Sequence, residues 1–133
     1  MSERARGTFD VTLAPLAVAH AGDNALGRMS IDKRFHGDLE AESRGEMLSF
    51  MTSVKGSAGY VAMERVTGTL GGRTGAFVLQ HSATMTRGEP QLSVTVVPDS
   101  GTGELAGLAG SLRIIIDGGA HSYELDYTLG AGS

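Results

Sequence analysis

The sequence predicts an all-β domain in which eight strands close into an antiparallel barrel. Apolar and polar residues alternate over several stretches, and glycine supplies 20 of the 133 residues while proline supplies 3. Glycine at this frequency without a repeat period is typical of tight turns and barrel corners. Strands this long in one small domain would leave open sheet edges, which favours closure over a sandwich. A lipocalin-like barrel is the alternative arrangement.

The strands are expected at short intervals along the chain. TFDVTLA near the start and YELDYTL near the end alternate in period 2, so each has one inward face. In LRIIID, three apolar residues face inward and Ile115 faces outward. Turn residues bound the remaining runs. The expected strands span residues 7–14, 27–36, 39–53 with a bend at position 45, 60–70, 73–85, 91–97, 111–117 and 121–129.

No stretch of 11 or more residues shows convincing helical periodicity. The segment SGTGELAGLAG, residues 100–110, allows one or two helical turns at most, and its G-x-G-x-x-x-G spacing does not match a dinucleotide-binding loop. We expect this loop to fold across one end of the barrel, with Leu105 and Leu108 as plugs.

One hairpin has a register that can be predicted. The Gly-Gly pair at residues 71–72 favours a two-residue type I′ turn, which requires positive φ at both positions. This turn places Ala62 opposite His81 and Glu64 opposite Leu79. Glu64 and His81 then form a diagonal pair on the more apolar face of the hairpin, with Cα atoms about 7 to 8 Å apart.

Glu64 and His81 are the candidate catalytic residues. A carboxylate and an imidazole on a largely apolar interior face are costly to bury unless they are paired. Burial also shifts the pKa values of such groups toward those useful in acid–base catalysis. The pair could equally satisfy its own hydrogen bonds, or Glu64 could bond Arg65 or Arg73, with no chemical role.

The first functional prediction is a barrel that binds a small, mostly apolar ligand, because an eight-stranded barrel leaves room for one such molecule. One alternative is a cofactor-independent isomerase or cyclase in which Glu64 or His81 moves a proton. Another is a solidly packed oligomeric module that associates through outward residues such as Ile115 and Val97. The expected ligand-binding residues are Tyr60, Glu64, Phe77, Leu79, His81, Tyr123 and Tyr127.

Composition argues against several partners. The net charge of −4, with 11 basic residues scattered among 15 acidic ones, argues against nucleic-acid binding. Without cysteine there is no disulfide, thiolate metal ligand or thiol nucleophile, which is compatible with a reducing compartment, so we expect a cytoplasmic protein. No apolar run approaches the ~20 residues that span a bilayer, so no membrane partner is expected.

No metal and no cofactor are expected. The four histidines lie far apart in sequence, and none belongs to an i, i+2 pair or an HExxH motif. They are His20, His36, His81 and His121.

Several blocks of the sequence closely resemble, in the same order, a bacterial domain family of unknown function. They are FHGDLEAESRGEM, GSAGYVAMERVTGTLGGRTGAFVLQH, VVPDSGTGELAGLAG and YELDYTL, and the resemblance covers nearly the whole chain. It implies an eight-stranded barrel with a central cavity, similar in fold to allene oxide cyclases, and self-association into a homo-oligomer. It supplies no activity, and no functional residue of the cyclases matches a position here.

Overall fold

The computed structural model describes residues 3–17 and 26–129, and in this part of the chain all regular structure is β. Each of the eight predicted strands is present, and the structure contains one additional strand of two residues. No helix in these residues is long and apolar enough to cross a membrane. The strands are β1 (Glu3–Pro15), β2 (Gly27–Gly37), β3 (Leu39–Met51), β4 (Ala58–Leu70), β5 (Arg73–Thr86), β6 (Glu89–Val96), β7 (Thr102–Gly103), β8 (Ala109–Asp117) and β9 (Ala120–Thr128).

The long strands form a closed antiparallel barrel, as predicted. They follow the order β4-β3-β2-β1-β9-β8-β6-β5, and the pairing of β5 with β4 completes the ring. Strand β1 begins at Glu3, earlier than expected, because its first residues pair with β9 from Glu3–Tyr127 to Thr8–Ser122. The two-residue strand β7 pairs with Gly75 and Ala76 of β5, beyond the part of β5 that β6 covers.

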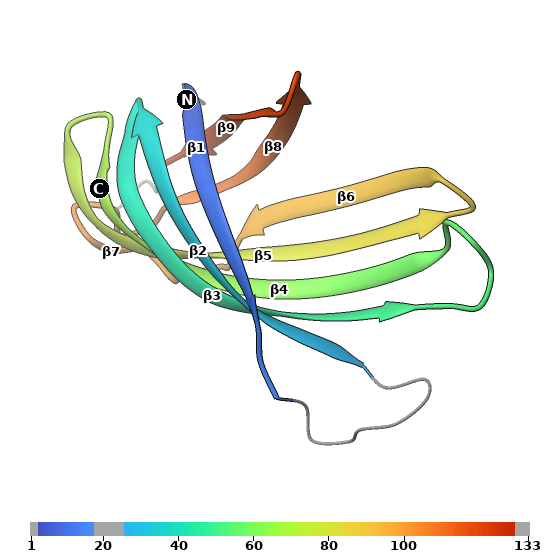
Figure 1. Cartoon of the computed structure of the whole chain (residues 1–133). Coiled ribbons are helices and arrows are strands. Elements are labelled where there is room, and N and C mark those ends of the chain that lie inside the picture. The colour runs from blue at the N-terminus through green and yellow to red at the C-terminus, as the bar shows by residue number, and fades with distance from the viewer. Residues whose placement is uncertain (1–2, 18–25, 130–133) are drawn as a thin grey trace.

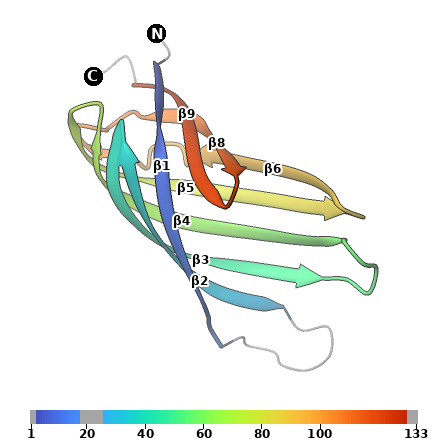
Figure 2. The same ribbon diagram turned by 45° about the horizontal axis from the view of Figure 1, so that its top comes forward.

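The number of paired residues between neighbouring strands differs around the barrel. Strands β3 and β4 pair along their whole length, from Leu39–Leu70 to Met51–Ala58. Strands β6 and β8, in contrast, are joined by the single pair Thr95–Ser111. The two strands diverge from this point, so that β3 to β6 project to one side of the barrel (Figures 1 and 2). We call the Thr95–Ser111 junction the β6–β8 seam.

One half of the interior is filled by the protein's own side chains. Phe35 and Tyr123 pack edge to face with ring centroids 5.6 Å apart, and the Tyr123 hydroxyl accepts a 2.9 Å hydrogen bond from the backbone N–H of Leu39. Leu105 and Leu108 are fully buried in the same core, which confirms the prediction that the 100–110 loop plugs one barrel end. We call this region the packed half.

The predicted hairpin register is also confirmed. Residues 71–72 form the turn with φ of +56° and +85°, and Ala62 pairs with His81 and Glu64 with Leu79. Glu64 and His81 therefore lie on the inner face, diagonal to each other. At Gly45, where a bend was predicted, the third strand continues, and Gly45 pairs with Glu64 in an uninterrupted β3–β4 ladder.

Candidate functional site

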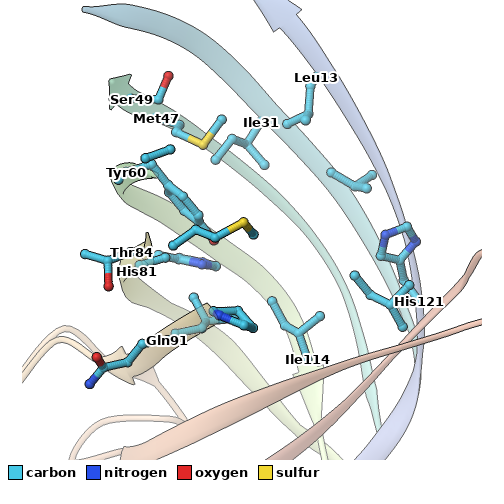
Figure 3. Close-up of a pocket in the computed structure, with 18 of the residues that line it drawn as sticks. Leu13, Ile31, Met47, Ser49, Tyr60, His81, Thr84, Gln91, Ile114 and His121 are labelled. Atoms are coloured by element: carbon cyan, nitrogen blue, oxygen red, sulfur yellow. The ribbon is translucent and has the colours of Figure 1, made fainter. Parts of the chain in front are cut away.

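The half of the barrel opposite the packed half contains a cavity of about 510 Å³. Its walls come mainly from the end of β3, the start of β4, the end of β5 and the start of β6, where these strands project beyond the core (Figure 3). The lining consists of Phe9, Val11, Leu13, Ile31, Lys33, Met47, Ser49, Phe50, Met51, Ala58, Gly59, Tyr60, His81, Ala83, Thr84, Met85, Pro90, Gln91, Leu92, Ile114, Ile116 and His121.

Apolar side chains that reach solvent also belong to this lining. Leu13, Met51, Met85, Leu92 and Ile116 all line the cavity and are all exposed, Met51 to 82% and Ile116 to 66%. Contiguous exposed apolar residues around a hollow are typical of binding grooves and interfaces. We call these five residues the rim. The cavity is therefore open to solvent through an apolar mouth.

At the inner end of the cavity, Glu64 holds three partners from three strands. Its Oε1 accepts from Lys33 Nζ of β2 at 2.9 Å and lies 2.6 Å from His81 Nε2 of β5, while its Oε2 accepts from Ser43 Oγ of β3 at 2.5 Å. The Glu64 side chain is inaccessible to solvent, and those of Lys33 and His81 are only 7% and 4% exposed. We call these four residues the Glu64 cluster.

The partners of Glu64 keep it ionised. Burial by itself would raise its pKa, but the hydrogen bond from His81, the charge of Lys33 and the hydroxyl of Ser43 together outweigh burial and lower the pKa from 4.5 to about 2. Both carboxylate oxygens are engaged, so Glu64 has little capacity left for another donor. Its hydrogen bonds link Lys33, Ser43 and His81 to one carboxylate.

The orientation of the His81 ring follows from the charge of Glu64. An ionised carboxylate only accepts hydrogen bonds, so Nε2 of His81 must carry the proton that is donated to Oε1. The hydrogen bond of the ring within residues 3–17 and 26–129 is made by Nε2 and not by Nδ1, and the residue lines the cavity. Nδ1 is thus the ring nitrogen that Glu64 does not engage.

Lys33 lies between the Glu64 carboxylate and two aromatic rings. Its Nζ is 5.0 Å from the ring centroid of Phe9 and 5.8 Å from that of Phe35, so both rings face the ammonium group. An ammonium group has three N–H donors, and Glu64 takes one of them in the described part of the chain. Lys33 also lines the cavity.

Tyr60 and His121 add polar groups to the cavity wall. Tyr60 is diagonal to His81 in the β4–β5 ladder, and burial, followed by the nearby charge of Glu64, raises the pKa of its hydroxyl. His121 projects from β9 on the opposite wall and packs on Phe9 with ring centroids 5.2 Å apart. Polar groups therefore reach the cavity from both sides (Figure 3).

The structure separates the seven expected ligand-binding residues into three groups. Tyr60 and His81 line the cavity, and Glu64 lies directly beneath it. The other four face inward as predicted but belong to the packed half, because aromatic and leucine side chains from the other strands fill the barrel at their height. These four are Phe77, Leu79, Tyr123 and Tyr127.

Sequence reasoning missed three residues of the site. Lys33 stands between Ile31 and Phe35 at i±2 spacing, which places a charged residue on an inward face and was a usable signal. Ser43 and His121 gave no such signal, since small polar residues and single histidines alternate with apolar ones on many strands. The cluster forms only when β2, β3, β4 and β5 are brought together.

No group of three or more histidine, aspartate or glutamate side chains in the described ranges is placed to hold a metal ion. His36 lies on the outer face near Asp10, with Nε2 3.4 Å from its carboxylate. His20, the remaining candidate, falls outside the described residues.

Comparison with known proteins relates the whole barrel to one family. The sequence profile described as "Protein of unknown function (DUF3224)" matches residues 5–127. A crystal structure of a DUF3224-family protein of unknown function from Shewanella oneidensis MR-1 shares 52% identity, with 98% of each chain covered and a TM-score of 0.93. No curated protein matches the chain.

Proposed function

Because this chain belongs to the DUF3224 family, whose function is unknown, its role must be argued from its site, and we propose that it binds a small, mostly apolar molecule in the barrel cavity. The observation that carries the proposal is the open cavity of about 510 Å³ with apolar walls and a few polar groups at its inner end. Ligand sites in proteins typically have this size and this distribution of polarity.

The exposed rim gives the binding its driving force. Leucine, methionine and isoleucine side chains at the mouth are in contact with water in the unliganded barrel. Covering apolar surface contributes about 25 cal/mol for each Å² removed from water. An apolar molecule that reaches from the inner end to the mouth would bury both the walls and part of the rim.

The Glu64 cluster supports a positioning role for Glu64 more than a chemical one. A general base must accept a proton, whereas Glu64 has a pKa of about 2 and is already bonded to three donors. Of the two candidate catalytic residues, His81 is the better placed, because its Nδ1 remains available to the cavity. We therefore assign Glu64 to holding His81 and Lys33 in place.

The proposal can be tested with a neutral fluorescent probe and a variant that fills the cavity. N-phenyl-1-naphthylamine should bind the wild-type protein with increased fluorescence, and Ala83→Phe, on the inner face, should weaken binding by about tenfold or more. Gln80→Phe places the same ring on the outer face of the same strand and should leave binding unchanged. Equal binding by the wild type and Ala83→Phe would contradict the proposal. Native mass spectrometry after gentle purification should also detect a retained molecule.

A further inference from the structure

Charged groups are distributed unequally between the cavity and the rest of the molecule. The chain has 15 acidic residues against 11 basic ones, yet none of the residues of ranges 3–17 and 26–129 that line the cavity is an aspartate or a glutamate. The titratable side chains in the described part of the lining are Lys33, Tyr60, His81 and His121. A ligand in the cavity of an acidic protein thus meets basic and phenolic groups.

Among the described residues, Glu64 is the carboxylate next to the cavity, and it leaves donor groups available there. Glu64 is covered by its own cluster, where both of its oxygens accept hydrogen bonds. It neutralises the charge of Lys33 but does not use all of the N–H donors of that ammonium group. The polar atoms available at the inner end are consequently the remaining Lys33 donors, the Tyr60 hydroxyl and Nδ1 of His81.

We propose that the occupant of the cavity is an apolar monocarboxylic acid, with its carboxylate at the inner end beside the donors of Lys33 and Tyr60. This inference rests on the proposed binding function and specifies its ligand. A carboxylate removed from water needs several donors, and charge-assisted hydrogen bonds are stronger than neutral ones. The inner end provides such donors from Lys33 of β2 and Tyr60 of β4.

The rim restricts the rest of the ligand. Side chains of Leu13, Met51, Met85, Leu92 and Ile116 surround the mouth and offer no hydrogen bond, so a second charged end would be placed against apolar carbon. The acid should therefore carry one charged group, with an aliphatic or aromatic body that extends toward the mouth.

Competition among three ligands of one chain length tests the inference. Decanoate, decan-1-ol and decylammonium differ in their polar end and should each be titrated against bound N-phenyl-1-naphthylamine. Decanoate should displace the probe at a concentration about tenfold or more below that of decan-1-ol, because it gains charge-assisted hydrogen bonds. Decylammonium should be the weakest, since it faces Lys33.

Variants connect the preference to Lys33. Lys33→Met should reduce the advantage of decanoate over decan-1-ol to about twofold or less. Lys33→Met leaves Glu64 without its ammonium partner, so a second variant, Lys33→Met/Glu64→Gln, removes both charges together. In this double variant the advantage of decanoate over decan-1-ol should fall to the same extent. Lys55→Met is the control: Lys55, the other lysine of the sequence, is exposed on the β3–β4 loop and does not line the cavity, so the advantage should persist.

The outcomes separate the two proposals. If decan-1-ol or decylammonium displaces the probe as well as decanoate does, or if both Lys33 variants retain the preference for decanoate, the cavity binds apolar molecules and the acid assignment is wrong. If neither the probe nor any of the three ligands binds, the binding function itself is wrong.

Discussion

The carboxylate of Glu64 on β4 and the imidazole of His81 on β5 lie 2.6 Å apart, between Oε1 and Nε2, at diagonal positions of one hairpin. With Lys33 and Ser43 they form a polar cluster at the boundary between the packed half and the cavity. The cluster connects the stability of the barrel to the chemistry of its inner end, because the same hydrogen bonds that satisfy Glu64 also orient the groups a ligand would meet.

The first prediction concerns stability at acid pH. The folded protein lowers the pKa of Glu64 from 4.5 to about 2, so the stabilisation is complete above pH 4.5 and is lost as the pH falls toward 2. A change of this size corresponds to roughly 3 kcal/mol of unfolding free energy. Chemical denaturation at a series of pH values should show it in the wild type, and Glu64→Gln should lack that part of the pH dependence. Parallel curves for the two proteins would contradict it.

The second prediction separates the loss of a charge from the loss of a pair. Lys33→Met leaves a buried carboxylate without its ammonium partner and should lower the unfolding free energy by about 3 kcal/mol. Lys33→Met/Glu64→Gln removes both charges and should recover more than half of that loss, since a neutral amide can keep bonds to His81 and Ser43. Urea denaturation of the two single variants and the double variant measures the coupling. Additive losses would mean that the ion pair contributes nothing.

The third prediction concerns the close contact between β3 and β4 at Gly45. A Cβ atom added there would meet the carbonyl oxygen of Met63 and lie 2.7 Å from Cα of Glu64. Gly45→Ala should therefore destabilise the barrel by about 3 kcal/mol and displace Glu64. At Gly59, also in a strand, an added Cβ would lie 3.5 Å from its nearest neighbour, so Gly59→Ala should change stability by less than about 0.5 kcal/mol. Equal effects in urea denaturation would argue against a steric requirement at Gly45.

The fourth prediction concerns hydrogen exchange at the β6–β8 seam. Thr95–Ser111 is the single pair between these strands, so every second amide in the rest of β6 lacks a ladder partner on that side. These amides should exchange with solvent much faster than those of β4, which is paired on both sides along its length. Exchange followed by NMR checks this at single residues. Protection along β6 as uniform as that along β4 would show that the seam is closed in solution.

Much of the fold could be predicted because short-range patterns specify it. The Gly-Gly turn at 71–72 fixed the register of β4 and β5, and that register placed Glu64 and His81 side by side on the inner face. Period-2 alternation located the other strands to within a few residues. The turn chemistry of one hairpin was thus enough to find half of the polar cluster.

The rest of the site depends on contacts between segments that are distant in sequence. Lys33 and Ser43 reach Glu64 through the β2–β3 and β3–β4 registers, which no turn motif fixed in advance. Phe77 and Tyr123 face inward as expected, but whether an inward residue meets a cavity or a packed core depends on the side chains of the opposite wall. Alternation predicts whether a side chain points into the barrel. It does not predict whether that side chain is packed in the core or lines the cavity.

The β6–β8 seam bears on how the barrel would select its ligands. Residues from both sides of the seam, Leu92 on β6 and Ile116 on β8, belong to the cavity wall, and a single residue pair joins these two strands directly. We therefore expect the width of the cavity to vary more readily at the seam than at the inner end, where Glu64 is hydrogen-bonded to three side chains. Family members that keep the Glu64 cluster but differ in their residues on β6 and β8 should bind ligands with the same polar group and apolar parts of different size.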